Sequence, residues 1–232
     1  MKAVLFDLDG TLLPMDQDVF VKAYFKELCT KAAPIGYDPD KLISGIWAGT
    51  GAMVKNQGQK TNENVFWDTF AGIFGEKAYA DKAVFDDFYA NEFDKAKDVC
   101  GFNPKAGELV KRLKNAGIKL VLASNPIFPV VAQKKRMHWA GIDPDDFEYI
   151  TAYENSHYSK PNPMYYVEVL KVLGYDAKDC IMVGNDVSED MCASEAGIKT
   201  FLLTDCMINT AEKDISVFDH GGFTELENHL FG

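Results

Sequence analysis

Cysteine and histidine, the residues that build most zinc sites, are scarce in this chain. The sequence holds 5 cysteines and 4 histidines in 232 residues, and neither type shows the paired spacing typical of zinc ligands. The odd number and wide spacing of the cysteines also disfavour a disulfide framework. We therefore expect reduced thiols that mostly pack in the interior, at Cys29, Cys100, Cys180, Cys192 and Cys206.

Long apolar runs and an excess of positive charge are absent as well. No stretch approaches the roughly 18 uninterrupted apolar residues of a membrane span, and no signal-peptide pattern precedes the first apolar run. The sequence has 24 basic and 35 acidic residues, and the resulting net charge of −11 disfavours nucleic acid or an anionic membrane as a partner. We expect a cytoplasmic protein, and the sequence leaves its oligomeric state open.

The hydrophobic pattern changes once along the chain. Between about Asp16 and Asp98 it has only the three- and four-residue steps of helices, at 19–33, 40–56, 63–75 and 81–97. Aromatic side chains recur at these steps, and we interpret them as the core of a helical bundle. The residues concerned are Phe66, Trp67, Phe70, Phe74, Phe85, Phe88 and Phe93.

From about Pro104 onward, predicted helices alternate with short apolar strands. The helices are expected at 105–117, 128–140, 163–173 and 187–196, and the strands at 118–124, 147–152, 180–184 and 199–204. This alternation predicts an α/β fold with a doubly wound parallel sheet, a Rossmann-like core, whose first strand is the apolar run from Ala3 to Phe6. We therefore expect a catalytic core of residues 1–14 and 100–232, with residues 15–99 inserted as an all-helical cap.

The segment FDLDGTLL, at residues 6–13, places two carboxylates at the end of the first predicted strand. Asp7 and Asp9 follow the apolar run at once, and the carboxyl edge of an open parallel sheet is where ligands bind. Taken alone, the segment is equally typical of an Asx turn after a strand. Its position at the sheet edge nevertheless makes both aspartates candidates for chemistry.

Polar residues also stand at or near the ends of other predicted strands. Ser124 and Asn125 close the strand at 118–124, Lys160 lies in the loop SKPNP, and Asn185, Asp186, Glu189 and Asp190 follow the strand at 180–184. Each feature has a structural alternative: a helix cap, a solvated loop charge and an acidic helix start, respectively. Together with the first segment, these features favour a single shared site.

A site of this composition predicts a divalent cation and a phosphate. Two carboxylates ~5 Å apart repel by about 3 kcal/mol at an effective dielectric of about 20, and oxygen ligands without cysteine or histidine favour Mg²⁺. Lys160, the Ser124 hydroxyl and the backbone amides of the Gly10–Thr11 turn are the expected phosphate donors. In phosphoryl transfer, one aspartate would form an aspartyl-phosphate and the second would protonate the leaving oxygen.

These motifs resemble those of the haloacid dehalogenase-like superfamily of phosphatases and related phosphotransferases. FDLDGT matches the first motif, Ser124 in LVLASN the second, and Lys160 in SKPNP the third. The resemblance implies that Asp7 is the nucleophile and a Mg²⁺ ligand. It also implies that Asp9 is the general acid/base, with its backbone carbonyl facing the metal, and that Ser124 and Lys160 hold the transferring phosphoryl group.

We also expect Thr11 and Asn125 to contact the substrate. The helical insert after the first motif resembles the small cap domain of the superfamily, whose closure shields the aspartyl-phosphate and selects the leaving group. The aspartate at position 9 resembles a phosphatase or mutase more than a dehalogenase, because dehalogenation has no leaving oxygen to protonate.

The fourth motif departs from the superfamily pattern, in which a metal-binding Asp commonly follows a Gly at once. This chain reads VGNDVSEDM, with Asn185 directly after Gly184 and Asp186 one position later. We favour Asp186 as the direct metal ligand, because an amide supplies no charge, with Asp190 behind it. Asn185 as the ligand, paired with Glu189 or Asp190, is the alternative register.

The function expected from the sequence is a Mg²⁺-dependent phosphomonoester hydrolase that acts on a small phosphorylated metabolite. One alternative is a phosphomutase, which would use the same residues but return the phosphoryl group to a second hydroxyl of a sugar phosphate. The other alternative is a non-catalytic binding or regulatory domain of the same fold, in which the altered fourth motif weakens metal binding.

Overall fold

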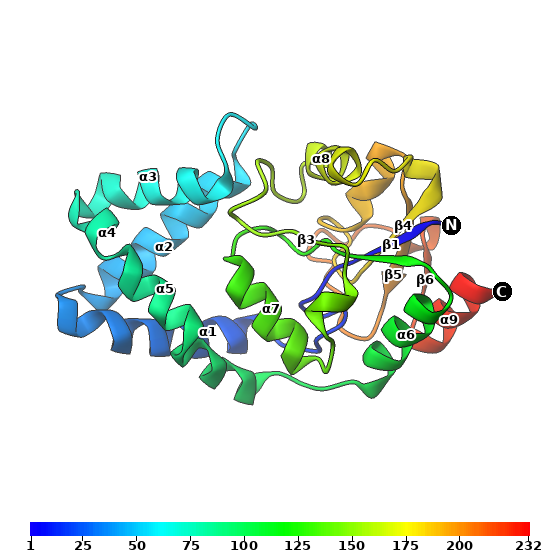
Figure 1. The fold of residues 1–232 in the computed structure, drawn as a ribbon, viewed down its shortest axis with the longest axis horizontal. Coiled ribbons are helices and arrows are strands. Elements are labelled where there is room, and N and C mark those ends of the chain that lie inside the picture. The colour runs from blue at the N-terminus through cyan, green and yellow to red at the C-terminus, as the bar shows by residue number, and fades with distance from the viewer.

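Six short strands, all parallel, form the sheet on which the fold is built (Figure 1). The structure, a computed structural model, describes residues 1–232. The strand order is β3-β2-β1-β4-β5-β6, so the predicted α/β fold with a doubly wound parallel sheet is confirmed. The strands are β1 (Ala3–Phe6), β2 (Lys119–Leu122), β3 (Tyr149–Ile150), β4 (Cys180–Gly184), β5 (Lys199–Leu203) and β6 (Asp219–Gly221).

The register of the central strands brings their carboxyl ends to one level. Phe6, the last residue of β1, lies opposite Leu122 of β2 and Val183 of β4. All four residues of β1 are buried, because neighbouring strands and covering helices enclose them on every side. The polar residues that follow β1, β2 and β4 therefore emerge together at one edge of the sheet.

Helices cover both faces of the sheet, as a parallel sheet requires. Leu5 of β1 packs with α8 (Pro163–Leu173) and the 3₁₀ helix η5 (Met191–Ala196) on one face. Val4 and Phe6 belong to the core on the opposite face, together with α6 (Pro104–Asn115), α7 (Val130–Trp139) and α9 (Phe223–Phe231). Short 3₁₀ turns complete this part of the chain, at η3 (Pro144–Asp146), η4 (Ala177–Asp179) and η6 (Ile215–Val217).

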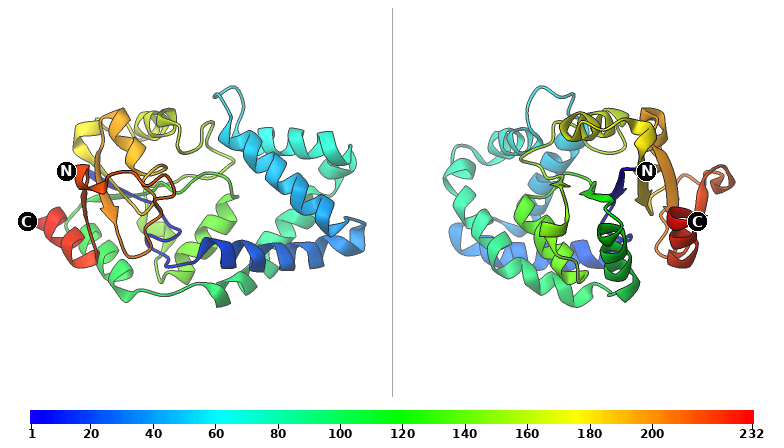
Figure 2. Two further views of the ribbon diagram at one scale, coloured as in Figure 1. Left: turned by 180° about the vertical axis from the view of Figure 1, so that it is seen from behind. Right: turned by 45° about the vertical axis from the view of Figure 1, so that its right-hand side comes forward.

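The chain between β1 and α6 forms a helical lobe at one end of the molecule, and both termini lie at the opposite end (Figures 1 and 2). Its elements are α1 (Gln17–Ala32), η1 (Ala33–Ile35), α2 (Pro39–Val54), α3 (Asn62–Phe74), α4 (Lys77–Ala80), α5 (Lys82–Ala90) and η2 (Glu92–Val99). The side chains of Asp16, Asp38 and Thr61 cap the three long helices by accepting backbone amide hydrogens. The aromatic residues expected in the core are buried, except Phe74, which is half-buried.

The helical lobe and the sheet lobe share one continuous apolar core. Helix α7 of the sheet lobe packs against α5 and η2. At this contact the Phe93 ring of η2 lies 5.1 Å from the Trp139 ring and 6.2 Å from the Phe128 ring, measured between centroids. The lobes are therefore joined by packed aromatic side chains as well as by the chain itself. No helix combines the length and the apolarity needed to cross a bilayer.

A buried amide, Asn62 at the start of α3, also joins the two lobes. Its Nδ2 donates to the Pro126 carbonyl at 3.1 Å and to Ser159 Oγ at 3.0 Å, and its Oδ1 accepts from Asn56 Nδ2 at 2.9 Å. Pro126 follows the second motif and Ser159 precedes Lys160. The helical lobe is thus tied to both loops that carry expected phosphate-binding residues.

Two helices predicted from the sequence are shorter than expected because side chains compete with the backbone. The helix expected at 81–97 breaks at Asn91, whose Nδ2 bonds to the carbonyl and the carboxylate of Asp87. The helix expected at 187–196 is a turn followed by η5, because Asp186 and Asp190 accept hydrogen bonds from backbone amides within the loop.

The sheet extends at its C-terminal end beyond the strands predicted from sequence. Strand β6 reads DHG, which has no apolar run, and it pairs only with β5 at the edge. The strand expected at 147–152 shrinks to the two residues of β3 at the other edge. Edge strands need little apolar surface, so the hydrophobic pattern predicts them poorly.

Candidate active site

Lys160 reaches the end of β1 from the loop before α8 and contacts two carboxylates. Its Nζ lies 3.0 Å from Asp7 Oδ1 and 2.6 Å from Asp190 Oδ1, and its side chain is fully buried. Burial acts to lower the pKa of Lys160, but the Asp190 and Asp7 carboxylates outweigh it and raise that pKa well above its ordinary value. The ammonium group is therefore charged and is fixed between the first and fourth motifs.

The loop after β4 is shaped by hydrogen bonds to its own carboxylates. Asp186 Oδ1 accepts from the backbone amides of Ser188 and Glu189, at 2.7 and 2.8 Å. Asp190 Oδ2 accepts from the Asp186 amide at 2.8 Å, while its Oδ1 accepts from Lys160. Both carboxylate oxygens of Asp190 thus accept hydrogen bonds within the protein. Asp186 Oδ2 accepts none and is available to a ligand.

Asn185 points from this loop toward the first motif. Its Oδ1 accepts from Thr11 Oγ1 at 2.9 Å, and its Nδ2 donates to the Cys206 carbonyl at 2.7 Å. The approach is so close that a Cβ on Gly10 would lie 2.3 Å from the Asn185 Nδ2, and the φ of Gly10 is +82°. Only glycine combines that backbone angle with the space that Asn185 needs.

The Gly10–Thr11 turn does not present the phosphate donors that the sequence suggested. The amide of Gly10 donates to the Leu13 carbonyl at 2.8 Å, and the amide of Thr11 donates to the Leu8 carbonyl at 3.1 Å. The Thr11 hydroxyl lies 3.3 Å from Asp7 Oδ2 and 2.9 Å from Asn185 Oδ1. The expectation of backbone amide donors here was wrong, because the tight turn uses both N–H groups itself, and Thr11 links Asp7 to Asn185.

The second motif lies beside this group at the end of β2. Ser124 is buried, and its backbone carbonyl accepts from Thr151 Oγ1 at 2.8 Å and from the Tyr165 hydroxyl at 3.0 Å. Asn125 accepts from the Lys160 amide at 3.2 Å and donates to Glu189 Oε2 at 2.9 Å. Asn125 therefore joins the loops of the second, third and fourth motifs, a positioning contact that the sequence did not predict.

Asp9 pairs with a residue that no sequence motif indicated, Arg136 of α7. The Arg136 guanidinium is fully buried, contacts Asp9 Oδ2 through Nη1, donates to Gln133 Oε1 at 2.6 Å, and stacks 4.4 Å from the Phe128 ring centroid. Burial nevertheless raises the pKa of Asp9 above its ordinary value, with Arg136 opposing that rise. A raised pKa suits a carboxyl group that must carry a proton at neutral pH.

A cavity of about 190 Å³ lies at the carboxyl edge of the sheet, and Lys160 and Thr11 lie behind its lining, where they contact Asp7. Its lining includes the candidates Asp7, Asp9, Ser124, Asn125, Asn185 and Asp186. No three Asp, Glu, His or Cys side chains converge as a ready metal cluster. The donors fit Mg²⁺, which takes one or two carboxylates and keeps several waters, because Asp7, Asp186 and the Asn185 amide offer oxygen atoms at one cavity.

Comparison with known proteins places this chain in a family. A model of the haloacid dehalogenase-like hydrolases matches residues 1–197 of the chain. The chain belongs to this family. A phosphoglycolate phosphatase from Aquifex aeolicus is 25% identical over 204 residues, which cover 87% of this chain and 84% of that protein. The pyrophosphatase PpaX from Bacillus velezensis is 24% identical over 198 residues, covering 85% and 81%.

Solved structures agree with the fold of this haloacid dehalogenase-like hydrolase. A phosphatase of the family from Thermococcus onnurineus matches with a TM-score of 0.61 at 19% identity, over 100% of this chain and 99% of that one. YfnB from Bacillus subtilis, a family member solved with magnesium, matches with a TM-score of 0.59 at 20% identity over 100% and 99%. With the curated relatives, family membership identifies the chain as a phosphatase.

Proposed function

We propose that the chain is a Mg²⁺-dependent phosphomonoester hydrolase that acts on a small phosphorylated metabolite through an aspartyl-phosphate. The observation that carries this proposal is the position of Asp7: it lies at the end of β1, beside the cavity, with Lys160 Nζ at 3.0 Å and Thr11 Oγ1 at 3.3 Å from its carboxylate oxygens. A carboxylate fixed on both sides is oriented for attack on phosphorus.

In the first step, an Asp7 oxygen attacks phosphorus, the ester P–O bond breaks, and Asp9 donates its proton to the leaving oxygen. In the second step, Asp9 takes a proton from a water that attacks the same phosphorus, which releases inorganic phosphate and restores the Asp7 carboxylate. The Lys160 ammonium and the Ser124 hydroxyl would stabilise charge on the equatorial oxygens.

Bound Mg²⁺ would neutralise phosphate charge, and we propose Asp7, the Asp9 carbonyl, Asp186 and the Asn185 amide oxygen as its protein ligands. The Asp186 carboxylate supplies negative charge, while Asn185 stands close to Asp7 through the Thr11 bridge. Asp190 would act behind these ligands by orienting Lys160. Five unpaired thiols and a small metabolite as substrate fit a cytoplasmic enzyme.

We propose that residues 15–99 act as the cap over this site and that residues 1–14 and 100–232 form the catalytic core. Phe20, Val21 and Trp47 of the helical lobe line the cavity that holds Asp7 and Asp9. Apolar side chains at this place would exclude bulk water from the aspartyl-phosphate until the attacking water is in position.

The test is phosphate release from a chromogenic aryl phosphate, with Mg²⁺ and with chelator, for the wild type beside Asp7→Asn. We expect metal-dependent release in the wild type and a loss of at least a thousandfold in the variant, because an amide cannot replace the nucleophile. Urea unfolding of both proteins serves as the control for folding. Near-normal turnover in a folded Asp7→Asn variant would exclude the aspartyl-phosphate mechanism.

A further inference from the structure

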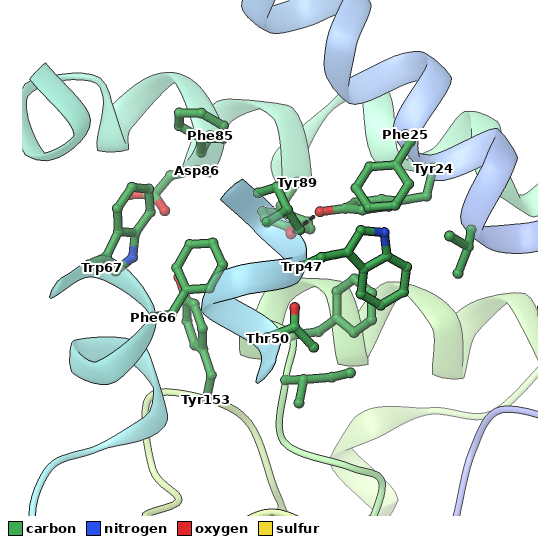
Figure 3. A pocket seen from close by; sticks show the side chains of 14 residues that line it. Tyr24, Phe25, Trp47, Thr50, Phe66, Trp67, Phe85, Asp86, Tyr89 and Tyr153 are labelled. Atoms are coloured by element: carbon green, nitrogen blue, oxygen red, sulfur yellow. Dashed lines mark hydrogen bonds between the residues drawn. The ribbon is translucent and has the colours of Figure 1, made fainter. Parts of the chain in front are cut away.

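A second cavity, of about 90 Å³, lies between the helical lobe and the segments that follow β2 and β3, and Figure 3 shows its lining. Four residues line both cavities: Val21, Trp47, Ile127 and Phe128. The two spaces therefore adjoin across shared side chains. A group that is attached to a phosphate at Asp7 and reaches the second cavity would contact these four side chains.

The second cavity is almost entirely apolar. Its lining consists of 14 residues, of which 12 are hydrophobic, and aromatic rings from α1, α2, α3 and α5 surround it in Figure 3. Two of its hydroxyls share one hydrogen bond, because the phenolic oxygens of Tyr24 and Tyr89 are 2.8 Å apart and one donates to the other. The Trp67 indole N–H is buried without a partner, but it is a neutral donor.

Neither cavity is lined by a basic side chain that could pair with a negatively charged leaving group. No Lys, Arg or His lines either space, and the one charged residue of the second cavity is Asp86. Lys82 approaches Asp86 Oδ1 and Oδ2 at 3.1 and 2.9 Å, and lies 3.4 Å from a Glu63 oxygen, so this rim carries more negative than positive charge. A carboxylate placed here would lose its hydration without gaining an ion pair.

We propose that the leaving group of the natural substrate is an uncharged, apolar group that occupies the second cavity, in contact with Trp47, Phe66 and Phe128. This inference rests on the proposed phosphomonoester hydrolysis. A cavity of about 150 Å³ accommodates a benzene ring, so about 90 Å³ suits a short branched alkyl group. The substrate class then differs from phosphoglycolate and pyrophosphate, which the names of the relatives specify and which carry further negative charge.

The first experiment compares isobutyl phosphate with two carboxylate esters: its analogue in which one methyl group is replaced by a carboxylate, and phosphoglycolate, in which a carboxylate replaces the isopropyl group and has the same number of non-hydrogen atoms. With Mg²⁺, we expect kcat/KM for isobutyl phosphate to exceed that of the carboxylate analogue and of phosphoglycolate by at least tenfold. Equal or higher kcat/KM for either carboxylate ester would overturn the inference, while Asp7-dependent hydrolysis of any of these esters would leave the proposed function standing.

A pair of cap variants tests where the leaving group lies. Trp47 is 52% exposed, so Trp47→Ala removes a wall of the cavity without emptying the core, and Ile73→Ala alters a comparably exposed cap residue that lines neither cavity. We expect Trp47→Ala to lower kcat/KM for isobutyl phosphate about tenfold more than kcat/KM for methyl phosphate, because only the longer ester reaches the second cavity. Ile73→Ala should change neither. Equal losses on both esters in Trp47→Ala would contradict the assignment.

Binding without turnover gives an independent readout. Isobutylphosphonate cannot be hydrolysed, and Trp47 and Trp67 both line the cavity, so their fluorescence should change on titration with it in the presence of Mg²⁺. Phosphonoacetate, which carries a carboxylate, should bind at least tenfold more weakly. Comparable affinity for the two phosphonates would refute an apolar leaving-group cavity even if the protein is an active phosphatase.

Discussion

At the scale of single residues, the site depends on charges that are buried but paired. Lys160 and Arg136 are both fully buried, and each lies against a carboxylate of the first motif, Asp7 and Asp9 respectively. A buried cation without a partner would cost several kcal/mol, so each pair holds its carboxylate in place as well as balancing its charge. The two aspartates therefore have separate cations and separate orientations.

Arg136 is expected to position Asp9. In Arg136→Met, a side chain of similar length keeps the packing on Phe128 but removes the charge, so Asp9 loses its anchor. We expect kcat on an aryl phosphate to fall at least tenfold, with KM changed less than threefold, and stability to fall by about 3 kcal/mol. Steady-state kinetics and urea unfolding measure both.

Arg136→Lys is the matched control, because it keeps the positive charge beside Asp9. We expect the decrease in log kcat of Arg136→Lys to be less than half of the decrease in Arg136→Met. If the Met and Lys variants lose kcat equally, then the packing of Arg136 on Phe128 matters and its charge does not.

Removing the negative charge of Asp186 can decide whether Asp186 or Asn185 is the direct metal ligand in the fourth motif. Asp186→Asn keeps an oxygen that accepts from the Ser188 and Glu189 amides, so the loop should stay folded while its charge is lost. We expect Mg²⁺ affinity, measured by calorimetric titration, to fall more than tenfold in Asp186→Asn and less in Asn185→Ala. The reverse order would assign the direct contact to Asn185.

At the scale of elements, the start of α3 joins the helical lobe to the loops that contain Pro126 and Ser159. Asn62 is the only residue of that turn whose side chain bonds to both the Pro126 carbonyl and Ser159. Backbone hydrogen bonds also connect the lobes here. The Asn62 amide donates to the Ser156 carbonyl and the Glu63 amide donates to the Tyr153 carbonyl, both at 2.8 Å. Any opening of the proposed cap is thus expected to pivot near this turn.

Truncating Asn62 should therefore weaken the whole fold. Asn62→Ala leaves the Pro126 carbonyl and the Ser159 hydroxyl without their bonds to Asn62 and leaves Asn56 Nδ2 with the Lys60 carbonyl as its one acceptor, and we expect a loss of about 3 kcal/mol in urea unfolding. Asn64→Ala, two residues on, is the control: Asn64 is exposed, so its change should stay within about 0.5 kcal/mol. Similar losses in the two variants would mean that the junction is not held by this amide.

At the scale of the whole molecule, one apolar core spans both lobes, and the acidic cavity lies beside it. The chain has a net charge of −11, and several carboxylates meet at the sheet edge with only Lys160 and Arg136 as buried cations. A divalent cation bound there would relieve repulsion in the folded state and would have no comparable site in the unfolded chain.

Mg²⁺ is therefore expected to raise the thermal stability of the protein. At a concentration of 100 times its Kd, a ligand that binds only the folded state adds about 2.7 kcal/mol, which corresponds to a rise in Tm of about 5–10 °C for a chain of this size. Differential scanning fluorimetry measures the shift, with KCl at equal ionic strength as the control. Asp7→Asn should reduce it, and an equal shift in that variant would place the bound metal elsewhere.

The sequence by itself determined the central strands of the sheet and the polar residues at their carboxyl ends. An apolar run that ends in Asp7 and Asp9 specifies a buried parallel strand whose polar continuation must emerge at the carboxyl edge, and the same holds for Ser124 after β2 and Asn185 after β4. These features follow from local periodicity and from the common direction of parallel strands, so no tertiary contact is needed to predict them.

The tertiary structure alone decided which groups touch. Arg136 reaches Asp9 across 127 positions of sequence, and Trp47 and Phe128 come together from different lobes, yet neither contact has a periodic or motif signal. The conformation of the loop after β4 likewise depends on which backbone amides donate hydrogen bonds to its carboxylates. These bonds produce a turn where the sequence predicted a helix. Pairings and cavities arise from packing between distant segments, where many arrangements share one hydrophobic pattern.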